Sequence, residues 1–359
     1  MNSNHGREHR TINLYHEHRQ LLIMVTRACQ LNCVYCQFDR TKPAMTKDTL
    51  HGAIDLLMTA RHPEVKIQFF GGEPLLRMDL VMEGIAYAQA AAKTAGKTVG
   101  FIITTNTFAL TDELRAKLDK IGVVWILSFD GDADTQDDQR PLRAGGTKFR
   151  SAIEQIGRIA ASGAPYLVNM TVTPEHAFDT TRNALRLLDA GVTAISFGNR
   201  MGTDWDDERA VAYFRGIQTF LEEAQRRGLK IFVLNPVGRD EPMIISPTPN
   251  IDCDGTIYTG SVIPPLEKLL PNVVPVVRLG HLKDMTEFEQ LRVDRADLWR
   301  RMRAAVKGKP EEAIVESGLR MGQLSNSFFD RMTARGLCPG PLTPLSPAPP
   351  PPEPEKANA

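Results

Sequence analysis

Short apolar runs rich in β-branched residues alternate with longer amphipathic segments from residue 20 to about residue 230. This alternation is typical of repeated strand–helix units. The strands it predicts are Leu21–Thr26, Val65–Phe70, Val99–Thr104, Val123–Phe129, Tyr166–Val172 and Ala194–Gly198. The helices it predicts are Lys47–Ala60, Asp79–Ala95, Asp112–Ile121, Lys148–Ser162, Thr181–Ala190 and Asp207–Arg227. Thr46, Thr111 and Thr147 stand before three of these helices, where a hydroxyl can accept a hydrogen bond from a free amide of the first turn.

Strands this apolar, separated by helices, predict a mostly parallel sheet that helices cover. Right-handed crossovers in series close such a sheet into a full or partial barrel. The expected fold class is therefore α/β, a partial (β/α)6 barrel similar to the TIM barrel. An open doubly wound sheet is the main alternative. In either fold the chemistry lies at the carboxyl ends of the strands.

Composition divides the chain into four parts. Residues 1–19 form a polar, histidine-containing segment, which is expected to be a solvated tail rather than a metal site. The barrel is expected over 20–234, and a smaller α+β cap over 235–338, where proline and glycine interrupt the alternation before further helical patterns. Residues 339–359 carry prolines at a period of three and are expected to be extended or disordered. The histidines of the first part are His5, His9, His16 and His18, and the helical patterns of the cap are Met285–Val306 and Glu311–Arg335.

The charge balance indicates no polyanionic partner. Basic and acidic residues number 43 each, so the formal net charge is zero, and we expect neither nucleic acid nor a membrane as partner. No segment reads as a secretory signal or as a bilayer span, so a cytoplasmic location is expected. The five cysteines are too few and too unevenly placed for a secreted disulfide scaffold.

Cys29, Cys33 and Cys36 lie within eight residues, in the loop after the first predicted strand. Four thiolates saturate the irons of a [4Fe-4S] cluster, whereas three leave one iron open to an exogenous ligand. An iron–sulfur cluster is the favoured interpretation of this triplet. A zinc site completed by a histidine or by Cys253, and a set of unligated buried thiols, are the alternatives.

The segment "TRACQLNCVYCQF" resembles the cluster loop of the radical S-adenosylmethionine (SAM) superfamily, including the aromatic Tyr35 before the last cysteine. The resemblance implies that Cys29, Cys33 and Cys36 hold one [4Fe-4S] cluster whose fourth iron SAM chelates. It further implies reductive cleavage of SAM to a 5′-deoxyadenosyl radical that abstracts hydrogen from substrate, with electrons from a donor such as flavodoxin or ferredoxin. By similarity, the Tyr35 ring would lie near the adenine of SAM.

The segment "FFGGEPLL" follows the second predicted strand and resembles the glycine-rich motif of the same superfamily. Gly71 and Gly72 permit unusual backbone angles and close approach, so that carbonyls and the Glu73 region can meet the SAM ammonium group. Pro74 fixes the exit of the turn. An ordinary strand–helix turn is the alternative interpretation.

Two further segments resemble the family loosely. In "ITTNTFAL" Asn106 is expected on the SAM or substrate side of the cavity, or as a turn cap, and Thr107 stands where glycine is common. In "NMTVTP" Asn169 is expected at the cofactor site, but it is uncharged where a basic residue is expected.

The segment "LSFDGDADTQDDQR" resembles the pattern of the branch that modifies peptides and sulfatases. The resemblance places Ser128 against the methionine or ribose of SAM, Asp130 at the rim of the active site, and Arg140 on a carboxylate or structural partner. The alternatives are a simple turn at Asp130 and a surface ion pair for Arg140.

The segments "NIDCDGTIYTG" and "VVRLGHLKDM" resemble the core of a SPASM or twitch region, which in this branch carries auxiliary clusters. Here Cys253 and Cys338 are the remaining cysteines, and Gly260 stands where a ligand is expected. Two thiolates do not complete an ordinary cluster. We therefore predict a degenerate cap without auxiliary iron, in which Cys253 is a buried structural thiol rather than a catalytic one.

The expected function is that of a radical SAM oxidoreductase acting on a side chain of a peptide or protein, as in the maturation of ribosomally made peptides (RiPPs). A radical SAM enzyme for a small metabolite, which needs a more closed and polar cavity, is the first alternative. A non-catalytic or zinc-binding barrel protein is the second.

Overall fold

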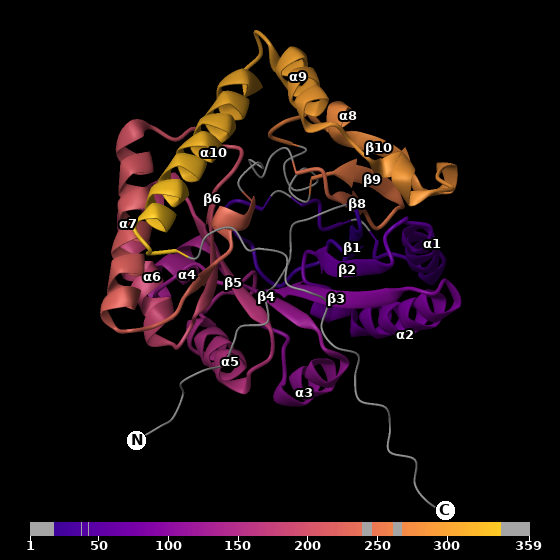
Figure 1. Ribbon diagram of the computed structural model, residues 1–359, viewed down its shortest axis with the longest axis horizontal. Helices are drawn as coiled ribbons and strands as arrows, with labels where there is room; N and C mark the ends of the chain where they lie inside the picture. The colour runs from indigo at the N-terminus through magenta and orange to yellow at the C-terminus, as the bar shows by residue number, and fades with distance from the viewer. Residues whose placement is uncertain (1–17, 37, 42, 239–245, 261–267, 339–359) are drawn as a thin grey trace, which may run out of the picture.

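The computed structural model describes residues 18–36, 38–41, 43–238, 246–260 and 268–338 (Figure 1). Its strands form one sheet in the order β10-β9-β8-β1-β2-β3-β4-β5-β6-β7. The strands expected from the sequence are all present, with bounds within one or two residues. The bounds are β1 (Gln20–Thr26), β2 (Glu64–Gly71), β3 (Thr98–Thr105), β4 (Val124–Ser128), β5 (Tyr166–Val172), β6 (Ala194–Asn199), β7 (Phe232–Val233), β8 (Pro249–Ile251), β9 (Thr256–Thr259) and β10 (Arg278–His281).

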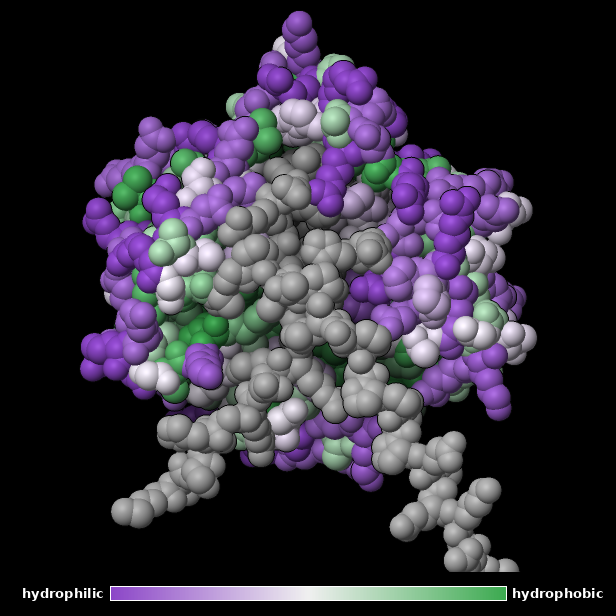
Figure 2. All heavy atoms as spheres, viewed as in Figure 1, coloured by the Kyte–Doolittle hydropathy of each residue, from purple (hydrophilic) through white to green (hydrophobic). Residues whose placement is uncertain are grey.

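Helices surround the outer face of this curved sheet (Figure 1). They present mostly hydrophilic side chains outward, as amphipathic helices packed on a sheet do (Figure 2). Their bounds are α1 (Lys47–Met58), α2 (Met78–Thr94), α3 (Asp112–Ile121), α4 (Ala133–Gln139), α5 (Phe149–Ser162), α6 (Thr180–Asp189), α7 (Asp207–Arg226), α8 (Val274–Val277), α9 (Arg295–Val306) and α10 (Glu311–Ala334).

The expected threonine caps are present at two helices and displaced at a third. Thr46 and Thr111 occupy N-cap positions and accept hydrogen bonds from the third amide beyond them. Thr147 also accepts a hydrogen bond, from Phe149 N, but Lys148 occupies the N-cap of α5. The sequence analysis missed α4 because that helix is short and polar and has no apolar periodicity.

Strands β1 to β7 pair in parallel and in the order of the sequence. A doubly wound sheet reverses its strand order at a switch point, and strands β1 to β7 contain no such reversal. Strands β7 and β10 are the two ends of the sheet, so among the described residues the barrel stays open. The expected α/β fold with a partial barrel is confirmed.

The C-terminal region continues the barrel sheet instead of standing apart from it. Strand β8 pairs in parallel with β1, opposite Leu22 and Ile23, and β9 and β10 follow as antiparallel neighbours. A second, smaller hydrophobic cluster joins β9 to α8, α9 and α10. The helical pattern from Met285 gives a short 3-10 turn, and α9 begins at Arg295 because the Asp294 side chain caps it.

The predicted tails, residues 1–19 and 339–359, lie almost wholly outside the described residues, and with them His5, His9 and His16. His18 is described, and its Nε2 donates a 2.7 Å hydrogen bond to the Phe288 carbonyl. In the described part of the chain, no helix has both the length and the apolar character that a bilayer crossing requires.

Candidate active site

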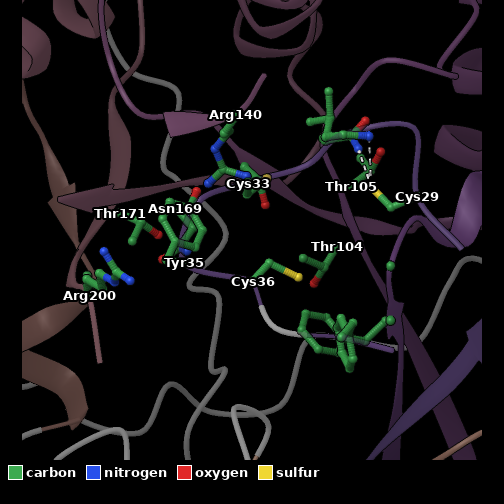
Figure 3. A pocket seen from close by; sticks show the side chains of 18 of the residues that line it. Cys29, Cys33, Tyr35, Cys36, Thr104, Thr105, Arg140, Asn169, Thr171 and Arg200 are labelled. Carbon is green, nitrogen blue, oxygen red and sulfur yellow. Dashed lines mark hydrogen bonds between the residues drawn. The ribbon is translucent and has the colours of Figure 1, made fainter. Parts of the chain in front are cut away.

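A cavity of about 220 Å³ lies at the carboxyl ends of β1 to β6 (Figure 3). Each of these strands, or the loop that follows it, contributes to the cavity wall, as parallel strands with their carboxyl ends at one edge allow. Predicted site residues that line it are Cys29, Cys33, Tyr35, Cys36, Gly71, Gly72, Asn106, Ser128, Arg140 and Asn169. The motifs that are scattered along the sequence therefore meet at one place.

Three predicted site residues do not line this cavity: Glu73, Pro74 and Asp130. Other residues that the sequence analysis missed do line it. They include Thr104, Thr105, Thr171 and Arg200, which stand at or just beyond the ends of β3, β5 and β6. Position at the carboxyl end of a predicted strand was the available signal for them.

The three cysteines line the same cavity as partly buried free thiols. Burial raises the pKa of Cys29 to about 11 and that of Cys33 to about 12. Thiols of this kind ionise readily only with a bound cation to compensate the charge, and metal coordination removes the proton outright. Cys29 Sγ also accepts a hydrogen bond from Leu31 N at 3.4 Å, and Asn106 Nδ2 stands 3.5 Å from it.

This donor set fits a cluster that leaves one iron open. Among the described residues, no group of three or more His, Cys, Asp and Glu side chains is placed to hold a single metal ion. A cubane cluster makes a different demand, because each of its thiolates binds a different iron atom. Cys253, which would complete a zinc site, is buried elsewhere, and its Sγ donates to the Met24 carbonyl at 3.1 Å.

The double-glycine turn packs directly on the backbone of the cysteine loop. Gly71 has φ +132°, and a Cβ built there would stand 2.2 Å from the Thr26 carbonyl oxygen. A Cβ on Gly72 would stand 2.2 Å from the Ala28 carbonyl oxygen. Gly72 N donates to Thr26 O, and Glu73 N donates to Ala28 O. Both positions therefore require glycine, because a side chain there would collide with the backbone of the cysteine loop. Ala28, the residue that Gly72 approaches, directly precedes Cys29.

Glu73 is fully buried beneath the cavity, where it joins the glycine turn to the end of β3. Its carboxylate accepts hydrogen bonds from Leu75 N at 3.0 Å, Thr105 Oγ1 at 2.9 Å and Asn106 N at 2.8 Å. Burial raises the pKa of Glu73 to about 7, and these three hydrogen bonds oppose the shift. In this arrangement the carboxylate holds two loops in register, while Gly71 and Gly72 face the cavity.

Asn106 caps a turn and also lines the cavity. Its Oδ1 accepts a hydrogen bond from Phe108 N at 3.0 Å, which is a turn-capping contact. Its Nδ2 is directed toward the Cys29 sulfur, on the cavity side. The next residue, Thr107, has φ +66°, and it is the single non-glycine residue of the described chain with positive φ.

Thr107→Gly is expected to stabilise the protein by about 1 kcal/mol. A β-branched residue is strained at this φ, and the Thr107 hydroxyl is buried without a hydrogen-bond partner among the described residues. Glycine removes the backbone strain and the unsatisfied hydroxyl, and part of this gain is offset because glycine makes the unfolded chain more flexible. Urea unfolding measures the change. Thr107→Ala is the matched control, because it removes the hydroxyl but keeps the strain and should recover less; equal gains from Gly and Ala would contradict the role of strain.

Asp130 and Arg140 form a buried ion pair that supports the cavity wall. Arg140 Nε and Nη2 donate to the Asp130 carboxylate at 2.8 and 2.9 Å. The Tyr35 hydroxyl donates to the same carboxylate at 2.7 Å, and Thr171 N donates to it at 2.9 Å. The Arg140 guanidinium also lies 5.3 Å from the centre of the Tyr35 ring.

This arrangement corrects two expectations. Asp130 is fully buried behind the wall, so it is not a residue of the active-site rim. Arg140 is 8% exposed, so the alternative of a surface ion pair is wrong. A buried pair with several further donors fixes geometry far more strongly than an exposed one. Asp130 thus fixes the Tyr35 side chain to the end of β5.

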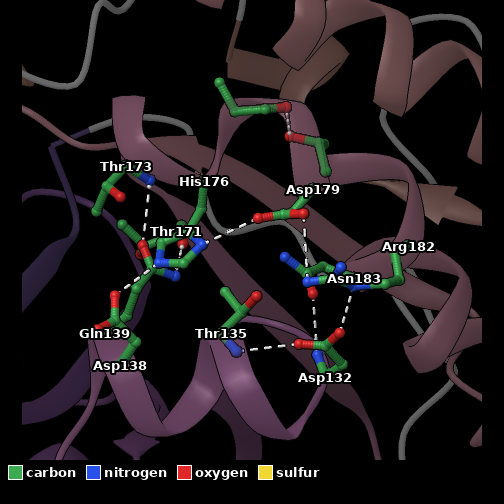
Figure 4. A network of polar contacts seen from close by, with 12 residues as sticks. Asp132, Thr135, Asp138, Gln139, Thr171, Thr173, His176, Asp179, Arg182 and Asn183 are labelled. Carbon is green, nitrogen blue, oxygen red and sulfur yellow. Dashed lines mark hydrogen bonds and ion pairs between the residues drawn. The ribbon is translucent and has the colours of Figure 1, made fainter.

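A polar network joins α4 to the end of β5 and to the segment that leads into α6 (Figure 4). Gln139 Nε2 donates to Thr171 O, and Thr173 N donates to Gln139 Oε1, each at 3.2 Å. His176 bridges Asp138 at 2.7 Å and Asp179 at 3.2 Å. Burial alone would lower the pKa of His176, but these two carboxylates raise it above its usual value. The network holds Thr171 in the cavity wall.

Comparison with known proteins gives one family. Residues 23–188 match the model of the Radical SAM superfamily. An uncharacterized protein of Methanocaldococcus jannaschii is 26% identical over 50% of this chain and 62% of its own length. GTP 3',8-cyclase of Rhodococcus opacus is 29% identical over 62% of both chains. PqqA peptide cyclase of Streptomyces rochei is 28% identical over 52% of this chain and 49% of its own. The chain spans about six tenths or less of the length of these relatives.

Solved structures give the same fold. "Native anSMEcpe with bound AdoMet and Cp18Cys peptide" superposes with a TM-score of 0.69 at 15% identity, over 88% of this chain and 97% of that one. The covered share exceeds the barrel, so the likeness includes part of the C-terminal region. The family match shows that residues 23–188, which contain the cysteine triplet and the glycine turn, are a domain of the radical SAM superfamily, whose members are enzymes that bind a [4Fe-4S] cluster and SAM.

Proposed function

We propose that this protein cleaves SAM reductively at a [4Fe-4S] cluster held by Cys29, Cys33 and Cys36, and abstracts hydrogen from a side chain of a peptide or protein. The observation that carries the proposal is the meeting of the three thiols and the double-glycine turn on one cavity. When bound, the cluster and SAM supply the electron transfer and the 5′-deoxyadenosyl radical. The protein supplies position, polarity and exclusion of water.

The other predicted residues are proposed to hold SAM in this cavity. Gly71, Gly72 and Asn106 present backbone and amide groups beside the cysteines, and Ser128 and Asn169 add polar side chains from β4 and β5. The Tyr35 ring is fixed by Asp130, so it offers a rigid surface for the adenine. Glu73, Pro74 and Asp130 act through the residues that they position. A flavodoxin or ferredoxin is the proposed electron donor.

A polypeptide substrate is supported by two likenesses. The solved structure described above contains a bound peptide and shares the fold of this chain beyond the barrel. The PqqA peptide cyclase is a relative of the barrel itself. A small-metabolite substrate is the second candidate, because GTP 3',8-cyclase is related at a similar identity over more of the chain.

Co-expression with a short precursor-like peptide encoded beside the gene tests the substrate class. We expect mass spectrometry of the recovered peptide to show a mass change confined to one residue or one crosslinked pair. The Cys33→Ala variant is the control and should return the unmodified peptide. Unmodified peptide from the active protein, together with 5′-deoxyadenosine formation stimulated by a cell extract freed of peptides, would favour the metabolite instead.

A further inference from the structure

Positive charge lines the cavity without acidic residues among its described lining. Three arginines, Arg40, Arg140 and Arg200, contribute to the wall, and the lining contains no aspartate or glutamate. A guanidinium at a partly desolvated site requires a counter-charge or a set of acceptors. The partner of each arginine therefore indicates what the cavity is built to receive.

Two of the three arginines have a side-chain partner in the described part of the protein. Arg140 is paired with the buried Asp130. Arg40 donates from Nη1 to Asn32 Oδ1 at 3.0 Å. Each of these two guanidinium groups is therefore held by a group of the protein itself.

Arg200 differs from Arg140 and from Arg40, whose Nε is likewise unpartnered but whose Nη1 donates to Asn32. Its Nε is buried with no hydrogen-bond partner, and its side chain forms no hydrogen bond or ion pair within the described part of the chain. Its charge helps to lower the pKa of Glu175, but no ion pair joins the two, and Glu175 does not line the cavity. An unsatisfied buried donor is costly, so a guanidinium kept in this state is poised for an anionic ligand.

The place of Arg200 in the sheet separates it from the cysteines. It follows β6 directly, where its own N–H donates to Val172 O at 2.8 Å, whereas the cysteines follow β1. Strands β2 to β5 stand between. Figure 3 shows Arg200 beside Thr171 and away from Cys29. The uncharged Asn169 lies in the same part of the wall, so Arg200 supplies the positive charge there.

We infer that Arg200 is a specificity-determining residue that binds a carboxylate of the substrate, either an acidic side chain near the modified residue or a peptide C-terminus. The inference rests on the proposed function, because it takes this cavity as the substrate site. The planar guanidinium can engage a carboxylate through two parallel hydrogen bonds, and the Thr171 hydroxyl and Asn169 amide offer further donors beside it.

Binding of small carboxylate probes to the reconstituted protein with SAM present tests the inference. The probes are N-acetylglutamate α-methylamide for an acidic side chain, N-acetylalanine for a C-terminus, and N-acetylglutamine α-methylamide as the neutral isostere. The rise of Tm with probe concentration gives each Kd. We expect one of the two carboxylates to bind at least about tenfold more tightly than the neutral probe, and Arg200→Met to abolish that preference. Arg200→Lys should restore part of it.

Three results separate this role from others. Arg143→Met, at an exposed arginine outside the cavity, is the matched control and should keep the preference. Without probe, Arg200→Met should leave Tm unchanged or higher, since the side chain has no described partner to lose; a marked fall would assign Arg200 a structural role and overturn the inference. Two further results for Arg200→Met would overturn it. One is an unchanged preference for the carboxylate probe over the neutral probe, and the other is a tenfold loss of SAM affinity with no change in that preference. Probe binding needs no SAM cleavage, so failure of the proposed radical chemistry is a separate result.

Discussion

Replacement of any one of Cys29, Cys33 and Cys36 by alanine is expected to abolish 5′-deoxyadenosine production. In the proposed cluster site each thiolate would bind a different iron, so no two of them would compensate for the third. The loss should be visible first in the reconstituted proteins, as absent 4Fe-4S absorbance and low iron and sulfide content. Anaerobic assay with SAM and dithionite, followed by chromatography of the products, then measures the activity directly.

Cys253→Ala is the matched control for these variants. Cys253 is 6% exposed, and its thiol donates to the Met24 carbonyl away from the cavity. The variant should keep the cluster and the activity, at the cost of a small buried cavity. Normal turnover in the three alanine variants would contradict the proposed cluster site. Loss of the cluster in the Cys253 variant would instead assign that thiol to it, and would contradict the interpretation of the cap as a region without auxiliary iron.

The barrel was predictable because its strands are buried on both faces and its helices are amphipathic. Such segments carry their own signal, and β5 and α3 begin and end at the predicted residues. Helix α4 carries no such signal, since its buried residues include the polar Gln136 and Gln139. Gln136 and Gln139 are buried because their side chains form hydrogen bonds with backbone groups at or just beyond the ends of β4 and β5.

The candidate site was predictable as a set of motifs but not as a set of contacts. The sequence marked Gly72 and Thr107 as notable positions, and the structure adds the reasons: the Ala28 carbonyl leaves no room for a side chain, and the turn after β3 requires positive φ. The sequence left two kinds of partner open for Arg140, a carboxylate or a structural group. The partner is Asp130, a carboxylate with a structural role. Arg200 belongs to no motif, and its distinguishing feature is an Nε without a hydrogen-bond partner among the described residues, which a sequence does not reveal.

Asp252→Asn is expected to destabilise the protein by about 3 kcal/mol or more. Asp252 and Arg27 are both fully buried, and Arg27 Nε donates to Asp252 Oδ1 at 2.9 Å while Nη2 donates to Oδ2. Breaking a buried ion pair by changing one partner typically costs about 3–5 kcal/mol. Because Arg27 lies two residues before Cys29, the variant should also release iron to a chelator faster than the wild type.

Urea unfolding of the matched variants measures the change. Asp79→Asn is the control, because Asp79 pairs with Arg77 at the surface and is 60% exposed, so its loss should cost less than about 1 kcal/mol. The double variant Arg27→Met with Asp252→Leu removes both charges and should recover much of the stability, as apolar replacements of buried pairs often do. If the free energy of unfolding of Asp252→Asn lies within about 1 kcal/mol of the wild-type value, the ion pair does not stabilise the contact between the β8–β9 turn and the cysteine loop. If Asp252→Asn lowers the free energy of unfolding by about 3 kcal/mol or more and the double variant restores it, the C-terminal region helps to position the proposed cluster site. It would do so through β8, which pairs with β1.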